Sequence, residues 1–234
     1  MLINAFRSLL YGGSVNFEYV LMQIIATLFV IFCILPLHEY AHGWMAEKLG
    51  DHTARAAGRL TLNPVASIDP FGALFLLLFG FGWAKPVPVN PWNFKKPKRD
   101  MAITALAGPV SNLLAALVGG IVYNALYLFV LPNLSITVSV AIATFFSAYI
   151  TINVSLAVFN LLPIPPLDGS RIISAFLSDR AMNAYYRYQN IIIMVLFLLL
   201  FSGVLDRPLG IAQNAALEGV LWIADLPFKL FGLA

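Results

Sequence analysis

Long apolar runs separated by short polar stretches make up most of the chain. A helix needs about 20 residues to cross the hydrocarbon core of a bilayer, and the longest apolar runs approach or exceed that length. They lie at about 19–45, 101–131, 136–160 and 188–204. A shorter run at 71–81 cannot span comfortably, and we expect it to enter the membrane and return as a half-span. The pattern predicts an all-α polytopic membrane protein with about four to six hydrophobic segments.

Prolines mark the breaks between these runs. Asp69 directly precedes Pro70, and this pair of N-cap and first-turn residues predicts the start of the half-span. The segment after it, 82–99, cannot be helical because its prolines remove backbone donors and fix φ, so we expect an extended loop associated with the membrane. A second proline-rich break at 161–169 precedes a short helix, which we predict over about 170–178.

Composition agrees with a membrane protein and excludes several other classes. Hydrophobic residues make up 60% of the chain and charged residues 11%, whereas soluble domains have about 45–50% and roughly 25%. The single cysteine excludes a disulfide scaffold, and the 13% aromatic content excludes a disordered chain. The net charge of +3 does not suggest nucleic-acid binding. We therefore expect the lipid bilayer, and no nucleic acid, as the partner of these surfaces.

The basic residues indicate how the spans are oriented. Most of them lie between the first span and the run at 101–131, and another group follows the run at 136–160. By the positive-inside rule these stretches face the cytoplasm. Residues 38–48 and 160–170 should therefore meet at the cytoplasmic membrane face. Since neither a signal peptide nor an organelle signal is evident, we expect a prokaryotic plasma membrane.

We interpret residues 1–234 as a single integral-membrane domain. Its functional core would cover about 18–178, followed by a C-terminal span and an amphipathic tail within 188–234. The tail beyond Asp206 could be a surface helix, a partial span or a contact surface. Its amphipathic pattern favours a surface helix.

The first span contains the motif LPLHEYAHGW, with three ionisable side chains where apolar ones are expected. His38 and His42 are one helical turn apart on the same face, so both imidazoles can bind one metal ion. Glu39 is close enough to take a proton from a water at that ion. Each ionisable residue in a membrane helix costs on the order of 2–3 kcal/mol, and a zinc ion would offset that cost. Pro36 should loosen the helix nearby.

A catalytic zinc site usually has three protein ligands and one open position, so a third ligand is required. His52 is one candidate, but it lies in a charged stretch soon after His42 and would need a sharp chain reversal. Asp168, in PIPPLDGSR, is the stronger candidate. Its prolines unwind the backbone near the cytoplasmic face, which is tolerated at membrane depth only in a protein interior or beside a cavity. Capping of the following helix is the alternative role for Asp168.

These motifs together resemble the site-2 protease family of intramembrane zinc metalloproteases, in the minimal form without PDZ or CBS domains. Asn160 in FNLLPIPPLDG matches an asparagine that helps to bind the tetrahedral intermediate in that family. The segment AGPVSN, which ends at Asn112, resembles its Gly-x-x-x-Asn pattern. The loop KPVPVNPWNF resembles the segment thought to present substrate as an extended strand. The late motif departs from the family's Asn-Pro-Asp-Gly form, with Leu167 before the retained Asp168.

The resemblance implies an enzyme that hydrolyses peptide bonds within or near transmembrane segments of membrane-protein or peptide substrates, as in regulated intramembrane proteolysis. One zinc ion would be held by His38, His42 and Asp168. Glu39 would act as general base, and Asn160 would bind the oxyanion or the substrate backbone. Asn112 could contact substrate or pack between helices. The loop residues expected to bind substrate are Pro86, Val87, Pro88, Val89 and Asn90. That loop could instead be a rigid interfacial turn.

Two other interpretations compete with an intramembrane protease. A zinc transporter or metal-storage scaffold would use His38 and His42, but it gives no role to Glu39 or Asn160. Transporters also tend to show repeated halves, and we find no internal repeat here. A non-catalytic relative that acts as a binding partner would have no need of an intact Glu39. The sequence therefore favours the protease.

Overall fold

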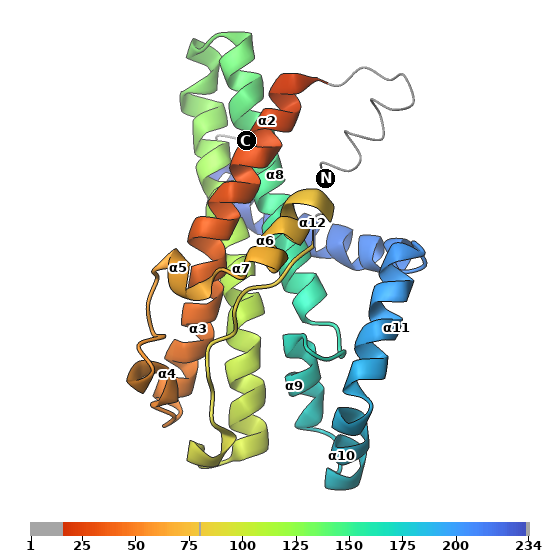
Figure 1. Ribbon diagram of the computed structural model, residues 1–234. Coiled ribbons are helices and arrows are strands. Elements are labelled where there is room, and N and C mark those ends of the chain that lie inside the picture. Colours follow the sequence, from red (N-terminus) through yellow and green to blue (C-terminus); the bar gives the residue numbers. More distant parts are fainter. Residues whose placement is uncertain (1–15, 80, 233–234) are drawn as a thin grey trace.

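The computed structural model describes residues 16–79 and 81–232, and these fold into helices joined by loops (Figure 1). Among the described residues, three helical segments are long and apolar enough to cross a membrane. They are Phe17–Lys48, Pro97–Phe129 (α7) and Ile136–Asn160 (α8). A pair bent by 60°, α10 (Asp179–Arg187) and α11 (Gln189–Phe201), adds a fourth span if it is counted as one. The prediction of an all-α polytopic membrane protein is confirmed.

The first span is a continuous helix with a wider turn in its middle. α2 (Phe17–Phe29) continues through a π-helical turn, Val30–Ile34, into α3 (Leu35–Lys48). At this turn the N–H of Leu35 bonds to the carbonyl five residues earlier. Pro36 has no N–H, and its ring crowds the preceding turn, which favours such a local widening. The loosening expected beside Pro36 is therefore present.

The central helix of the fold is α7. It packs against α3 and α8, and it also contacts α9 (Asp168–Ser174) and α12 (Asp206–Leu230). Small residues permit these close approaches. A Cβ at Gly119 would lie 2.5 Å from the ring of Tyr149, and one at Gly120 would lie 2.9 Å from α12. The glycines of α7 thus allow α8 and α12 to pack closely against it.

The short apolar run forms α6 (Pro70–Phe79). Two one-turn helices precede it, α4 (Thr53–Ala56) and α5 (Pro64–Ser67). Asp69 caps α6 as expected, because its Oδ1 accepts the N–H of Gly72 at 2.8 Å. The chain then turns back along the helix, since a Cβ on Gly72 would lie 2.0 Å from the carbonyl oxygen of Trp83. The run therefore returns on itself, as a half-span requires.

The proline-rich segment after α6 is extended over residues 82–90, as the sequence predicted. The last three residues of the predicted loop, 97–99, are helical instead, because Pro97 occupies the first turn of α7, where its missing N–H removes no helical hydrogen bond. Ile68 and Ala84 form an isolated antiparallel bridge. Next to it, the N–H of Lys85 donates to the carbonyl of Ser67 at 2.8 Å. A 3-10 turn, Pro91–Asn93 (η2), then leads toward α7. The loop is thus tied by its backbone to the residues before α6.

The C-terminal part differs in detail from the sequence prediction. A 3-10 turn, Leu131–Asn133 (η3), joins α7 to α8. The short helix expected over about 170–178 is α9, which begins two residues earlier and ends at Ser174. The tail forms α12, which crosses the α7–α8 pair (Figure 1) and contacts both helices. Asn124 Nδ2 donates to Asp225 Oδ1 at 2.8 Å, so this long helix is bonded to α7.

Candidate metal centre

Three buried side chains from two helices converge on one point. His38 and His42 lie one turn apart on α3, and Asp168 is the first residue of α9. The two Nε2 atoms are 3.0 Å apart. Oδ2 of Asp168 lies 3.3 Å from the first and 3.2 Å from the second. The structure thus brings together the two histidines and the aspartate that the sequence singled out.

Hydrogen bonds behind the histidines determine which ring nitrogens face this point. His42 Nδ1 lies 2.7 Å from the carbonyl oxygen of Thr104. A carbonyl can only accept, so in the neutral ring this nitrogen carries the hydrogen. His38 Nδ1 lies 2.6 Å from Oδ1 of Asn112 and donates in the same way. Both Nε2 atoms therefore direct lone pairs toward Asp168.

Three lone-pair donors with no hydrogen between them fit a cation. Oδ2 of Asp168 is buried and has no hydrogen-bond partner, and in the neutral rings the two Nε2 atoms beside it have no hydrogen to offer. Ligands at about 2.0–2.2 Å in a tetrahedral site lie about 3.3 Å from one another. The separations between Asp168 and the two imidazoles match that spacing. The residues present therefore fit a metal ion, with three protein ligands.

α7 comes close to the metal centre because Gly108 has no side chain. A Cβ at this position would lie 2.3 Å from Nε2 of His42 and 2.6 Å from Cε1 of His38. Four residues later on the same helix face, Asn112 reaches Nδ1 of His38. This arrangement gives a structural reason for both ends of the Gly-x-x-x-Asn pattern.

The position of Asn112 indicates a role that differs from both substrate contact and simple helix packing. It is fully buried against His38, and it is not among the residues that line the adjoining cavity. This geometry suits a residue that orients the candidate metal ligand His38 better than one that contacts substrate. Contact between Asn112 and substrate stays a prediction. Thr104 does the same for His42 through its backbone carbonyl, and sequence reasoning missed it because a carbonyl leaves no side-chain signature.

Replacing Asn112 with alanine should weaken zinc binding about 10- to 100-fold, because the His38 ring loses the partner that fixes its orientation. The measurement is competition for zinc against a chromogenic chelator. Asn153→Ala is a matched control, since Asn153 is equally buried but bonds to the carbonyl of Tyr149. Equal zinc affinities for the two variants would contradict the orienting role.

A cavity of about 230 Å³ adjoins the three converging side chains. Glu39 borders it, and its Oε2 accepts the N–H of Val87 at 2.7 Å. Other residues along its wall include Leu35, Trp83, Pro86, Leu156 and Arg171. The side chain proposed as general base and the candidate metal ligands therefore share one cavity.

The remaining predicted site residues fall into two groups. Asn160 lines the cavity, and its Nδ2 donates to the carbonyl of Leu156 at 3.0 Å. Pro86 and Val87 line it too, whereas positions 88–90 are not among its lining residues. Substrate contact by these loop residues stays a prediction. The structure places Pro86 and Val87 at the cavity and positions 88–90 farther along the loop.

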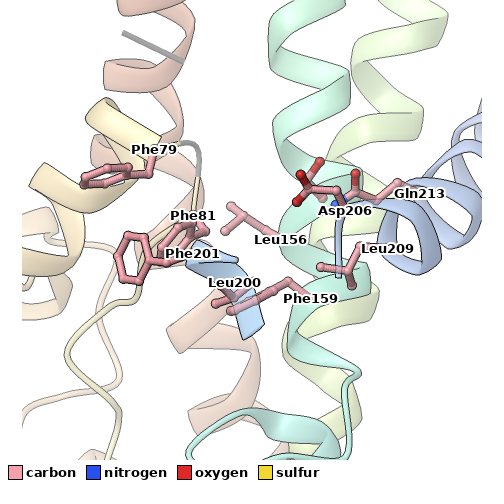
Figure 2. A pocket seen from close by; sticks show the side chains of 10 residues that line it. Phe79, Phe81, Leu156, Phe159, Leu200, Phe201, Asp206, Leu209 and Gln213 are labelled. Carbon is pink, nitrogen blue, oxygen red and sulfur yellow. The ribbon is translucent and has the colours of Figure 1, made fainter. Parts of the chain in front are cut away.

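A second, larger cavity of about 430 Å³ lies between α6, α8, α11 and α12. Figure 2 shows aromatic side chains, among them Phe81 and Phe201, on one side, with Asp206 and Gln213 of α12 on the other. Leu156 lines both this cavity and the one at the metal centre. The metal-centre side chains themselves do not line it.

His52, the other candidate for the third ligand, belongs to a different group. Its Nδ1 lies 2.9 Å from Oε1 of Glu47, and its side chain is 70% exposed. Nε of Arg55 lies 3.1 Å from the same oxygen. His52 is therefore part of a surface ion-pair group and lies outside the cluster of converging ligands.

Asp51 is a buried side chain that the sequence analysis did not single out. Its Oδ2 accepts the N–H of Asn90, and its Oδ1 accepts Nδ2 of Asn93, both at 2.7 Å. The N–H and hydroxyl of Thr53 also donate to Oδ1. Burial opposes ionisation, but the hydrogen bonds from Thr53, Asn93 and Asn90 hold the pKa of Asp51 below its usual value. The carboxylate thus ties the far end of the loop to the turn after α3.

Replacing Asp51 with asparagine should loosen this loop, because an amide nitrogen would face the N–H of Asn90. Loss of a hydrogen bond to a charged group costs about 1.5–3 kcal/mol. Hydrogen exchange at the Val87 and Asn90 amides should therefore accelerate roughly 10- to 100-fold, as measured by mass spectrometry. Asp225→Asn, which alters a carboxylate on α12, should leave these amides unchanged. Unaltered exchange in the Asp51 variant would refute the anchoring role.

Comparisons with known proteins agree with the geometry. Residues 125–203 match the model of Peptidase family M50. YwhC of Bacillus subtilis (strain 168), named as a candidate zinc metalloprotease, is 43% identical over 209 residues, which cover 88% of this chain and 92% of YwhC. Rip2 of Mycobacterium tuberculosis (strain H37Rv), with the same kind of name, is 30% identical over 188 residues, or 76% of this chain and 68% of Rip2.

Rip3 of the same strain is 31% identical over 213 residues, which are 88% of this chain but 44% of Rip3. No solved structure matches the chain. The similarity to YwhC extends along most of both sequences, and it agrees with the family-model match. The chain therefore belongs to peptidase family M50, the site-2 protease family.

Proposed function

We propose that this membrane metalloprotease hydrolyses peptide bonds within or beside transmembrane segments of other membrane proteins, using one zinc ion per chain. The observation that carries the proposal is the convergence of His38, His42 and Asp168 beside a cavity that Glu39 borders. Both histidines and Glu39 lie in a helix long and apolar enough to span a membrane. A hydrolytic site built into such a helix is suited to substrates that are themselves in the membrane.

The donor set supports zinc as the metal. Two imidazoles and one carboxylate, with a fourth position open, are typical of catalytic zinc sites. When bound there, zinc would supply Lewis-acid activation of a water and of the scissile carbonyl. The protein's part is to hold the two rings in one tautomer, which Thr104 and Asn112 do through the Nδ1 atoms.

Glu39 is placed to move protons at the cavity. The N–H of Val87 holds one oxygen of its carboxylate, which fixes the side chain at the cavity wall. From there Glu39 would take the proton of the attacking water and return it to the leaving amine. Asn160 donates one amide hydrogen to its own helix, and its second hydrogen can bond to the developing oxyanion.

The extended loop is suited to pair with an unwound substrate segment. In an extended chain, neighbouring residues direct their N–H and C=O groups to opposite edges. The N–H groups of Lys85 and Val87 are used on the inner edge, by Ser67 and Glu39. Pro86 and Pro88 belong to the outer edge and have no N–H. This edge therefore offers carbonyl acceptors, and a substrate strand added here would donate its N–H groups and keep its own carbonyls unpaired.

The orientation of the site follows from the basic residues. Lys and Arg residues follow the C-terminal end of α3 and occupy the start of α7. These ends lie on the side of the membrane toward which the converging residues of α3 and α9 are placed. By the positive-inside rule we place these ends at the cytoplasmic face of a prokaryotic plasma membrane. Substrates would then be cleaved on the cytoplasmic side of their spans.

Removing the metal should abolish proteolysis, and zinc should restore it. The purified protein, reconstituted in liposomes with a panel of labelled single-span membrane proteins, is dialysed against a chelator and assayed by gel and mass spectrometry. Cleavage should fall below detection and return on addition of about one zinc per chain, because the carbonyl loses its Lewis-acid activation. Proteolysis that persists in protein free of zinc would refute the proposed function.

A further inference from the structure

A cleft separate from the metal centre lies between the first turns of α7 and the residues that follow α9. Its volume is about 750 Å³. The walls are apolar and are formed by Pro97, Ala102, Ile103, Ala175 and Phe176. Three basic side chains, Lys96, Lys98 and Arg99, make up the rest of the lining. Such a combination fits a ligand with an apolar body and an anionic group.

The charged side chains that line the cleft are all basic. Lys95, Lys96, Lys98 and Arg99 are exposed cationic residues within one short segment. Arg99 pairs with the buried Asp100 at 2.7 Å, and Lys98 Nζ donates to the carbonyl of Leu177 across the cleft at 3.1 Å. The lining residues include no carboxylate. The cleft is thus complementary to a negative headgroup.

The cleft lies at the depth where lipid headgroups are expected. α7 has 33 residues, which makes it about 50 Å long at 1.5 Å per residue, whereas the hydrocarbon core is about 30 Å thick. Its first turns, which carry the basic residues, therefore extend into the headgroup region. Trp92, which precedes α7 by a few residues, is 89% exposed, and exposed tryptophans are typical of that region.

We propose that this cleft binds an anionic phospholipid. The phosphate would contact Lys96, Lys98 and Arg99, and an acyl chain would pack against Ile103, Ala175 and their apolar neighbours. A zwitterionic lipid would place the positive group of its own headgroup next to these basic residues. A free phosphate would leave the apolar walls unused. Basic pockets beside spanning helices are known as binding sites for acidic lipid headgroups, and each lysine near such a surface favours binding about fivefold.

The test is native mass spectrometry of the full chain in detergent, with phosphatidylglycerol and phosphatidylcholine of identical acyl chains. Phosphatidylglycerol should be retained as a discrete adduct, and phosphatidylcholine should not. The double variant K96Q/K98Q should bind phosphatidylglycerol about 30-fold more weakly, as two lysines predict. Ala175→Phe, which fills the cleft and keeps its charge, should also weaken binding. K48Q/R187Q, which removes the same charge from residues that do not line the cleft, should not.

Three outcomes would overturn the proposal. Equal retention of the two lipids would indicate only non-specific contact with apolar chains. An equal loss in K48Q/R187Q would indicate diffuse attraction to the basic face. Displacement of the lipid by glycerol phosphate at the same concentration would identify a site for the free anion. Lys98 also donates to the carbonyl of Leu177, so the single variant Lys96→Gln, which leaves that bond intact, should bind phosphatidylglycerol about fivefold more weakly. Its thermal unfolding should match that of the wild type, so its weaker binding cannot be attributed to misfolding.

Discussion

Glu39→Gln should lower cleavage about 10²- to 10⁴-fold while zinc stays at about one per chain, because general base catalysis contributes a factor of that size. Glutamine keeps the size of the side chain and an oxygen that can accept the N–H of Val87, so the cavity wall should be preserved. What it loses is the ability to take a proton. The measurements are cleavage of a reconstituted single-span substrate and zinc content by elemental analysis.

Glu47→Gln is the matched control for this experiment. Glu47 lies on the same helix, but its carboxylate pairs with His52 and Arg55 at the surface. This variant should cleave at the wild-type rate. Wild-type cleavage by the Glu39 variant would remove its role as general base. A drop in zinc content in the Glu39 variant would make Glu39 a part of the metal site instead.

Asp168→Ala should remove most of the zinc, so that less than about a tenth of the chains retain it after dialysis. Two imidazoles would be left where three protein ligands are usual. Among the described residues, the carboxylate is also the one candidate ligand that α9 contributes, so its loss should disconnect that helix from the metal. Elemental analysis of dialysed protein gives the zinc content, and cleavage should fall in proportion.

His52→Ala provides the comparison for Asp168→Ala. Its imidazole pairs with Glu47 and is exposed, so this variant should keep its zinc. If the Asp168 variant bound zinc as tightly as the wild type, the third ligand would have to be another residue. Circular dichroism should show the same helix content in both variants, because α9 is short and begins at position 168.

The sequence predicted the spans and the converging side chains well, for physical reasons. Hydrophobic length determines which helices can cross a bilayer, and the cost of ionisable groups there made His38, Glu39 and His42 conspicuous. The run at 136–160 coincides with α8. Asp168 was found because its proline-rich surroundings are unusual near a membrane.

Features that depend on long-range contact were not predicted. Thr104 acts through a carbonyl, and Asp51 bonds to residues about 40 positions later, so neither has a local pattern. The role of Asn112 stayed open because its partner, His38, lies 74 residues away in sequence. The start of α9 was misplaced by two residues, since an aspartate before glycine can either precede a helix or begin one.

The π-helical turn at Val30–Ile34 gives one membrane span two separate neighbours. Above it α2 packs mainly on α8, and below it α3 packs on α7. The extra residue per turn rotates one half of the helix relative to the other. The half that carries His38 and His42 can therefore keep its register against α7 independently of how the other half fits α8. Sequence changes in α2 should be accommodated at this turn, so α2 can vary with its surroundings while the candidate metal ligands of α3 stay in place.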